Sequence, residues 1–112
     1  MPLFTTTKQD SGPQVISFQG RVTFGRETEK CRQVLKDLLG QSERRFIFDL
    51  SKVEYVDSAG IGFLVSCLIT LSNEGAKLRL ASPPDRVQYV LKITKLNTIF
   101  QVFPSLDQAL QW

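Results

Sequence analysis

FIFDLSKVEYVDSAGIGFLVSCLITLSN, residues 46–73, is the stretch that decides the fold. Its first five residues form a short apolar run after a charged segment, which is typical of a strand covered on both faces. Ser51 and Lys52 then predict a turn, after which Val53, Tyr55 and Val56 lead the chain back towards the core. The stretch therefore begins with a central strand.

A long helix is predicted to follow this strand. Its apolar residues recur at spacings of three and four, as on one face of a helix: Ile61, Leu64, Val65, Leu68 and Leu71. Gly75 lies where a left-handed C-terminal cap is expected. Asp57 and Ser58 are both good N-cap residues, so either side chain would accept a hydrogen bond from a free backbone N–H group at the start of the helix.

Two glycines and a serine in this turn exceed what a helix cap needs. Gly60 and Gly62 occupy the first helical turn, where each costs up to about 1 kcal/mol relative to Ala, so they predict close approach by another backbone or by a partner. The Ser58 hydroxyl lies at a helix N-terminus, where free N–H groups and the helix dipole tolerate a phosphate group. Phosphate there would add a charge of roughly −1.5 to −2 and could switch off the binding of a partner.

Residues 50–62 join a strand, an Asp-Ser-x-Gly turn and a Gly-x-Gly helix start. In this order they resemble the signature of STAS domains, the group that includes bacterial anti-sigma factor antagonists. The resemblance implies that Ser58 is a phospho-acceptor with Asp57 as its supporting neighbour. It also implies partner switching: the unphosphorylated form binds an anti-sigma factor that is itself a serine/threonine kinase, and phosphorylation releases it. A PP2C-type phosphatase is left open as the enzyme that removes the phosphate.

The resemblance also outlines a partner-binding surface, which combines this turn with the loop before the first helix, residues 20–24. Its expected residues are Gly20, Arg21, Thr23, Asp57, Ser58, Gly60, Ile61 and Gly62. Arg21 and Thr23 depart from the Gly-Glu-Leu-Asp region of the antagonists, because they replace its two acidic residues. These two replacements affect which kinase the surface would recognise, but they do not affect the predicted fold. From the residue types alone, Asp57 and Ser58 are simply a helix cap, and the resemblance is what favours a phosphorylation site.

Strands and amphipathic helices alternate through the rest of the chain. A hairpin is predicted from strands at residues 3–8 and 14–19. The next expected elements are a helix over 28–39 closed by Gly40 and a strand over 76–81. A third helix is expected from Ser82-Pro83-Pro84-Asp85 to residues 95–97, with proline in its first turn. A strand over 99–103 and a helix over 106–111, capped by Ser105 and Gln108, complete the chain. The pattern predicts an α/β, STAS-like fold: a four- to five-stranded mixed sheet, parallel beyond the hairpin, packed with about four helices in a single domain of residues 1–112.

Composition limits the class of protein. The 112 residues are 42% apolar, enough for one core without metal or disulfide staples. The net charge of +3 is scattered, so nucleic-acid binding is not expected. The N-terminus lacks the features of a secretory signal, and no apolar run reaches the roughly 20 residues that a bilayer requires, so we expect a cytoplasmic protein without a membrane span. Cys31 and Cys67 are expected to be buried thiols and not a disulfide.

Several kinds of chemistry are missing from the sequence. It contains no His, which removes Ser-His-Asp triads, Cys-His pairs and the common zinc sites. No glycine-rich phosphate loop is present, and we expect neither an enzyme nor a cofactor. Three functions remain, in descending order: an antagonist regulated through Ser58, a STAS accessory subunit of a transporter or signalling assembly that uses the same surface without the switch, and a small α/β enzyme or ligand-binding domain.

Overall fold

The computed structural model describes residues 3–23 and 25–112. Phe24, expected at the partner-binding surface, lies outside the described residues, as do Met1 and Pro2. The elements follow one another as β1 (Phe4–Lys8), β2 (Gln14–Val22), α1 (Arg26–Gly40), β3 (Arg45–Val56), α2 (Ser58–Asn73), β4 (Lys77–Ala81), α3 (Asp85–Ile93), the 3₁₀ turn η1 (Leu96–Thr98), β5 (Gln101–Phe103) and α4 (Leu106–Leu110). Strand order in the sheet is β1-β2-β3-β4-β5. The β1–β2 pair is antiparallel and the other pairs are parallel, which confirms the predicted fold class.

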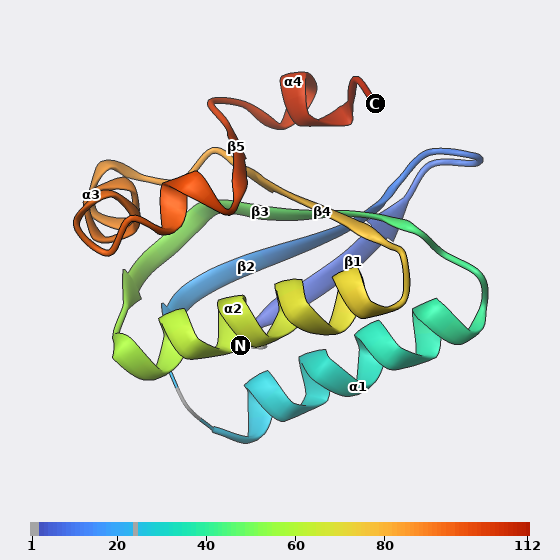
Figure 1. Ribbon diagram of the computed structural model, residues 1–112, viewed down its shortest axis with the longest axis horizontal. Helices are drawn as coiled ribbons and strands as arrows, with labels where there is room; N and C mark the ends of the chain where they lie inside the picture. Colours follow the sequence, from blue (N-terminus) through green and yellow to red (C-terminus); the bar gives the residue numbers. More distant parts are fainter. Residues whose placement is uncertain (1–2, 24) are drawn as a thin grey trace.

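Helices cover both faces of the sheet (Figure 1): α1 and α2 lie side by side on one face, and α4 lies on the other. α3 packs at one end of the sheet, and its buried Val87 and Leu91 belong to the same apolar core as α1 and α2. Ile16, Phe48 and Leu80 stand in register on three adjacent strands and are completely buried in the core beneath α1 and α2. On the opposite face, Ile47 packs in a smaller apolar cluster with Ala109 of α4. The middle strand β3 is therefore covered on both sides, as its apolar run predicts.

β3 continues through the predicted turn at Ser51 and Lys52, so that prediction is wrong. Residues 52–56 stay paired with β2, and the parallel register shifts twice along this part of the ladder. The Ser51 N–H group donates to the Asp49 carboxylate at 3.0 Å, at the position of the first shift. β2 also runs on to Val22, so Gly20 and Arg21 belong to the end of a strand and not to a loop.

The helix ends differ from expectation in two places. Gly40 is the last residue of α1 and does not cap it, since the left-handed conformation falls two residues later, on Ser42 (φ 70°). The prolines precede α3, with Pro84 as its N-cap residue, and do not lie in its first turn. The cap of α2 is as predicted, because Gly75 has a φ of 74°. Ser105 accepts from the N–H group of Gln108, as expected for α4.

Both cysteines are free and buried, as predicted: Cys31 lies on α1 and Cys67 on α2. Burial raises the pKa of the Cys67 thiol to about 12 and shifts the pKa of Cys31 in the same direction. Both thiols therefore remain protonated and pack as small apolar groups between the helices and the sheet.

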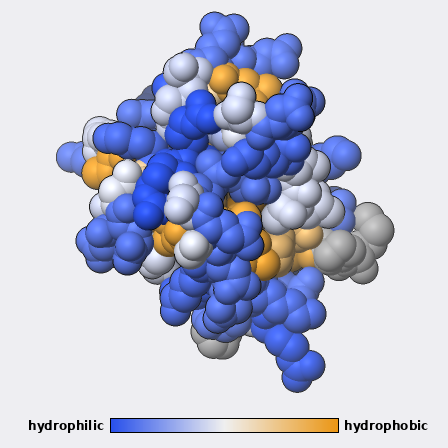
Figure 2. Space-filling model, turned by 90° about the vertical axis from the view of Figure 1, so that its right-hand side faces the viewer, coloured by the Kyte–Doolittle hydropathy of each residue, from blue (hydrophilic) through white to orange (hydrophobic). Residues whose placement is uncertain are grey.

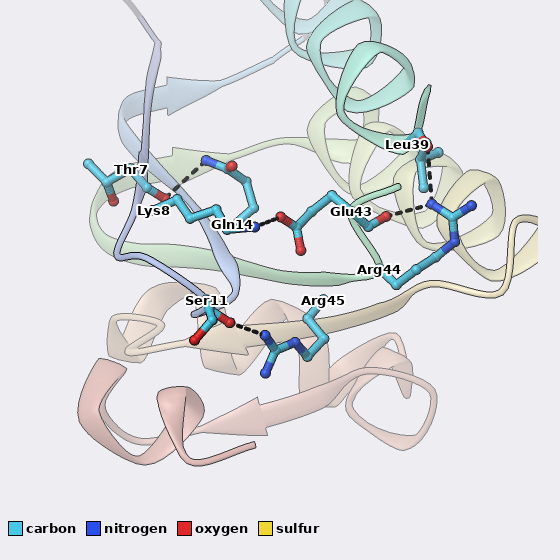
Figure 3. A network of polar contacts seen from close by, with 8 residues as sticks. All are labelled: Thr7, Lys8, Ser11, Gln14, Leu39, Glu43, Arg44 and Arg45. Carbon is cyan, nitrogen blue, oxygen red and sulfur yellow. Dashed lines mark hydrogen bonds and ion pairs between the residues drawn. The ribbon is translucent and has the colours of Figure 1, made fainter. Parts of the chain in front are cut away.

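A polar network fastens the hairpin to the start of β3 (Figure 3). Glu43 accepts from Lys8, Arg45 donates to the carbonyl oxygen of Ser11, and Arg44 donates to the carbonyl oxygen of Leu39 at 3.1 Å. Burial disfavours ionisation of Glu43, but the hydrogen bond and charge of Lys8, with the backbone N–H groups of residues 44 and 45, hold the pKa of this carboxyl below its usual value. The network lies at the end of the sheet where β3 begins, so β3 is anchored far from its last residue, Val56.

The face of the molecule nearest the β1–β2 turn is mostly hydrophilic, with apolar side chains in small separate groups (Figure 2). No helix in the part of the chain that the structure describes is long and apolar enough to cross a membrane.

Candidate partner-binding site

Asp57 caps α2. Its backbone is extended, and its carboxylate oxygen Oδ1 accepts from the N–H group of Gly60 at 2.7 Å. The carbonyl oxygen of Asp57 accepts from Ile61 at 2.9 Å, which begins the helical hydrogen-bond ladder. Of the two capping candidates in the sequence, the structure thus assigns the role to Asp57, and Ser58 is left without it.

Ser58 is the first residue of α2 and is exposed. Its hydroxyl has no hydrogen-bond partner among residues 3–23 and 25–112. The N–H groups of the first helical turn have no carbonyl partner within the helix, and the positive end of the helix dipole lies at the same place. A phosphate on Ser58 would therefore meet favourable electrostatics without breaking a bond of the fold.

Gly60 marks the contact between α2 and β2. A Cβ atom on Gly60 would lie 2.0 Å from the carbonyl oxygen of Val22 and 3.0 Å from the side chain of Val56. No side chain fits there, so the predicted close approach is confirmed at Gly60. It is not found at Gly62, which is exposed and would place a Cβ atom within 4 Å of nothing that the structure describes.

The end of β2 completes the same surface. Val22 pairs with Val56 and Arg21 with Tyr55, so the two segments expected at the partner surface lie side by side. Arg21 is exposed, and its guanidinium lies over the Tyr55 ring at 4.7 Å from the centroid. Gly20 takes a left-handed conformation with φ 78° where the ladder is irregular.

We call these eight residues the strand-end surface: Gly20, Arg21, Thr23, Asp57, Ser58, Gly60, Ile61 and Gly62. Ser58 and Gly62 are exposed, Ile61 and Thr23 are half-buried, and Gly60 is buried. Gly60 therefore joins the surface's two segments and offers little area to a partner, whereas Gly62 leaves the helix backbone bare.

A groove of about 700 Å³ adjoins the strand-end surface, and we call it the strand-end groove. Its charged lining residues are Arg21, Arg26, Glu27, Lys52 and Glu54. Hydrogen bonds from Lys30 and from the N–H group of Leu3 hold the pKa of Glu27 below its usual value. Within the described residues, no group of three or more His, Cys, Asp or Glu could hold a metal ion.

Sequence reasoning missed two features of this region. Tyr55 was expected to turn towards the core, but it is 37% exposed and lies beneath Arg21. The groove was not expected at all. Lys52 and Glu54 alternate with the buried Val53 on the strand, and this alternation is the signal that could have placed them on an open face.

Comparison with known proteins places this geometry in a family. Residues 5–109 match the STAS domain. A protein of Thermotoga neapolitana named "putative anti-sigma factor antagonist" is 33% identical over 78 residues, which cover 70% of this chain and 69% of that protein.

Solved structures share the fold. The Bacillus anti-sigma factor antagonist SpoIIAA in its unphosphorylated form superposes with a TM-score of 0.78 at 18% identity, over 95% of this chain and 91% of that one. A sulfate transporter family protein from Wolinella succinogenes gives a TM-score of 0.80 at 22% identity, over 93% and 86%. The match over residues 5–109, the relative in Thermotoga and the shared fold lead to one conclusion: this chain belongs to the STAS domain family.

Proposed function

We propose that this chain is an anti-sigma factor antagonist that works by partner switching. In the unphosphorylated state it binds an anti-sigma factor serine/threonine kinase in the cytoplasm through the strand-end surface, and phosphorylation of Ser58 ends the binding. The name of the Thermotoga neapolitana relative supports the general role. The kinase is what the resemblance to the antagonists implies, and the switch is supported by the exposed Ser58 at the start of α2.

One observation carries the proposal: Asp57, and not Ser58, caps α2. The Ser58 hydroxyl is exposed and takes no part in holding the helix start. It can therefore be modified while the cap stays in place. A kinase would transfer the γ-phosphoryl group of ATP to the Ser58 oxygen, with ADP as the leaving group and the hydroxyl proton released.

The phosphate would act on binding more than on folding. It adds a charge of roughly −1.5 to −2 to a surface that a partner must desolvate when it binds. Beside it, the bare backbone at Gly62 lets a partner approach the helix closely. Because the helix N-terminus already stabilises negative charge, the same group leaves the fold intact. In this scheme the kinase supplies the chemistry, and the chain itself needs no catalytic group.

The first experiment is mass spectrometry of the chain and its co-purifying proteins, isolated from the native cells. We expect phosphate on Ser58 in the free pool and an unphosphorylated pool bound to a serine kinase. Binding to that kinase would then be measured for Ser58→Ala, Ser58→Asp and the control Ser72→Asp, which puts the same charge at an exposed site in the last turn of α2. Only Ser58→Asp should weaken binding. Equal binding by both Ser58 variants would refute the switch.

A second candidate function is a STAS accessory subunit of a transporter or signalling assembly, in which the strand-end surface binds a partner without a phosphorylation switch. Its support is the fold shared with the sulfate transporter family protein, together with Arg21 and Thr23 in place of the acidic residues of the antagonist pattern. An unmodified Ser58 in a chain that co-purifies with a transporter protein would favour this function over the first.

A further inference from the structure

Unpaired positive charge surrounds the strand-end groove. Arg21, Arg26 and Lys52 are all exposed and line it. None of the three makes an ion pair or a side-chain hydrogen bond within the described residues. This contrasts with the hairpin end of the sheet, where Lys8 has an acidic partner in Glu43.

The acidic residues of the groove do not neutralise these cations. Glu27 is already engaged, because it accepts from the N–H group of Leu3 at 3.3 Å and pairs with Lys30 at 3.1 Å. Glu54 is the other acid in the lining and forms no ion pair within the described part of the chain. Among the described residues, the groove lining therefore has three cations without an ion pair and one such carboxylate.

Two details suit this groove to carboxylates. Tyr55 holds the Arg21 guanidinium by its face, which leaves the N–H groups at the edge of the planar fork free to donate to a carboxylate. α1 begins beside the groove after Gly25, a residue with no side chain to accept from the first-turn N–H groups. The positive end of this 15-residue helix adds to the field of the three side chains.

We propose that the strand-end groove binds an acidic segment of the partner protein, with Arg21 as the main contact and Arg26 and Lys52 beside it. The inference rests on the proposed function, because Gly20, Arg21 and Thr23 belong to both the groove and the strand-end surface. An extended segment fits better than a small anion. The cations are exposed and lie along an open groove, whereas a small anion needs donors that converge on one point.

The test uses a defined probe, a fluorescein-labelled peptide of alternating Glu and Gly, with a Gln–Gly peptide as its neutral counterpart. Anisotropy should show binding of the Glu peptide alone, weakening as salt is raised. Amide shifts in the ¹⁵N-labelled chain should cluster at residues 20–26 and 52–54. Arg21→Glu should weaken binding roughly tenfold, because a reversal removes an attraction and adds a repulsion, and Lys52→Glu should weaken it by a smaller factor. Arg21→Gln should weaken it less.

Lys36→Glu is the matched control, since Lys36 is an exposed cation on α1 that does not line the groove. Equal weakening by this variant would show non-specific attraction and overturn the proposal, as would shifts elsewhere on the chain. Inorganic phosphate that produced the same shifts at the same concentration would show a small-anion site instead, which also overturns it. The titration is repeated with Ser58→Ala, so its outcome does not depend on whether Ser58 is ever phosphorylated. The experiment thus distinguishes a chain whose groove does not bind acidic peptides from a chain that is not regulated through Ser58.

Discussion

The carbonyl oxygen of Val22 lies against the Cα atom of Gly60, so close that a Cβ atom there would be 2.0 Å away. Val22 ends β2, and Gly60 lies in the first turn of α2. This contact fixes how the helix leaves the sheet. It also joins the two segments of the strand-end surface, which are more than 30 residues apart in the sequence.

Gly60→Ala should destabilise the fold. The clash is with backbone, so the helix start must move, and we expect a loss of about 1–3 kcal/mol in the free energy of unfolding. Gly62→Ala is the matched control on the same turn, because no atom of the described residues outside the helix's own backbone lies within 4 Å of its added Cβ atom. It should be neutral or stabilise by up to about 1 kcal/mol through better helix propensity. Urea denaturation of both variants measures the difference, and equal effects would disprove the close contact.

Gly60 and Gly62 also show what a sequence can and cannot reveal about this site. Both glycines stand out in the sequence for the same reason: each lies in the first turn of a helix, where glycine is less stable than alanine. Val22, which is far from both in the sequence, makes the difference: its carbonyl oxygen packs against Gly60, whereas Gly62 is exposed. Asp57 and Ser58 are similar, since both side chains can cap a helix and only the backbone geometry assigns the cap to Asp57.

The fold itself was largely predictable because its signals are local and repeated. The apolar period of α2 and the apolar run of β3 each span several residues, and both elements were found. The turn predicted at Ser51 and Lys52 is wrong because these exposed polar residues lie at a register shift within a paired strand, and the pairing with β2 is not visible locally. Arg21 and Tyr55 meet through that same pairing, so their stack could not be foreseen.

Asp57→Ala should lower the free energy of unfolding by about 0.5–2 kcal/mol, because it leaves the N–H group of Gly60 without its acceptor. Ser58→Ala, one residue away, should change it by less than about 0.5 kcal/mol, since Ser58 makes no capping bond. Thermal unfolding followed by circular dichroism measures both. If Ser58→Ala proved the more damaging of the two, the assignment of the cap would be wrong.

Glu43→Gln should remove a stabilisation that depends on pH. The pKa of Glu43 is lowered in the folded chain, so its contribution is present above the unfolded value near 4.5 and is lost as the pH falls through the folded value. At pH 7 we expect the free energy of unfolding of the natural chain to be higher than that of the variant by about 1 kcal/mol. The difference is no larger because Lys8 is partly exposed, so that water screens the ion pair. This difference in the free energy of unfolding should disappear towards pH 3.

Glu74→Gln serves as the control for Glu43. Glu74 is an exposed acid without an ion pair in the described part of the chain. Urea unfolding at a series of pH values should therefore show a pH-dependent difference for Glu43→Gln only. A constant difference at all pH values would mean that the Glu43 carboxylate does not ionise differently in the folded and unfolded chain.

Arg79 of β4 holds the C-terminal segment against the sheet. Its guanidinium lies 4.7 Å from the Phe103 ring and 3.9 Å from the Trp112 ring, measured to the centroids. The same group donates to the carbonyl oxygens of Ala109 at 2.9 Å and Gln111 at 3.0 Å. Arg79→Ala removes all four contacts at once. Because Trp112 is the only tryptophan of the chain, its fluorescence reports on them directly.

We expect Arg79→Ala to shift Trp112 emission to longer wavelength and to increase its quenching by acrylamide, as the ring moves into water. Arg79→Lys is the informative comparison, because a lysine keeps the charge but lacks the planar fork that can stack on a ring and donate to two carbonyl groups. It should therefore resemble the alanine variant more than the natural chain. If Arg79→Lys behaved like the natural chain, charge alone would hold α4 in place; unchanged emission in both variants would mean that Trp112 does not pack on Arg79 in solution.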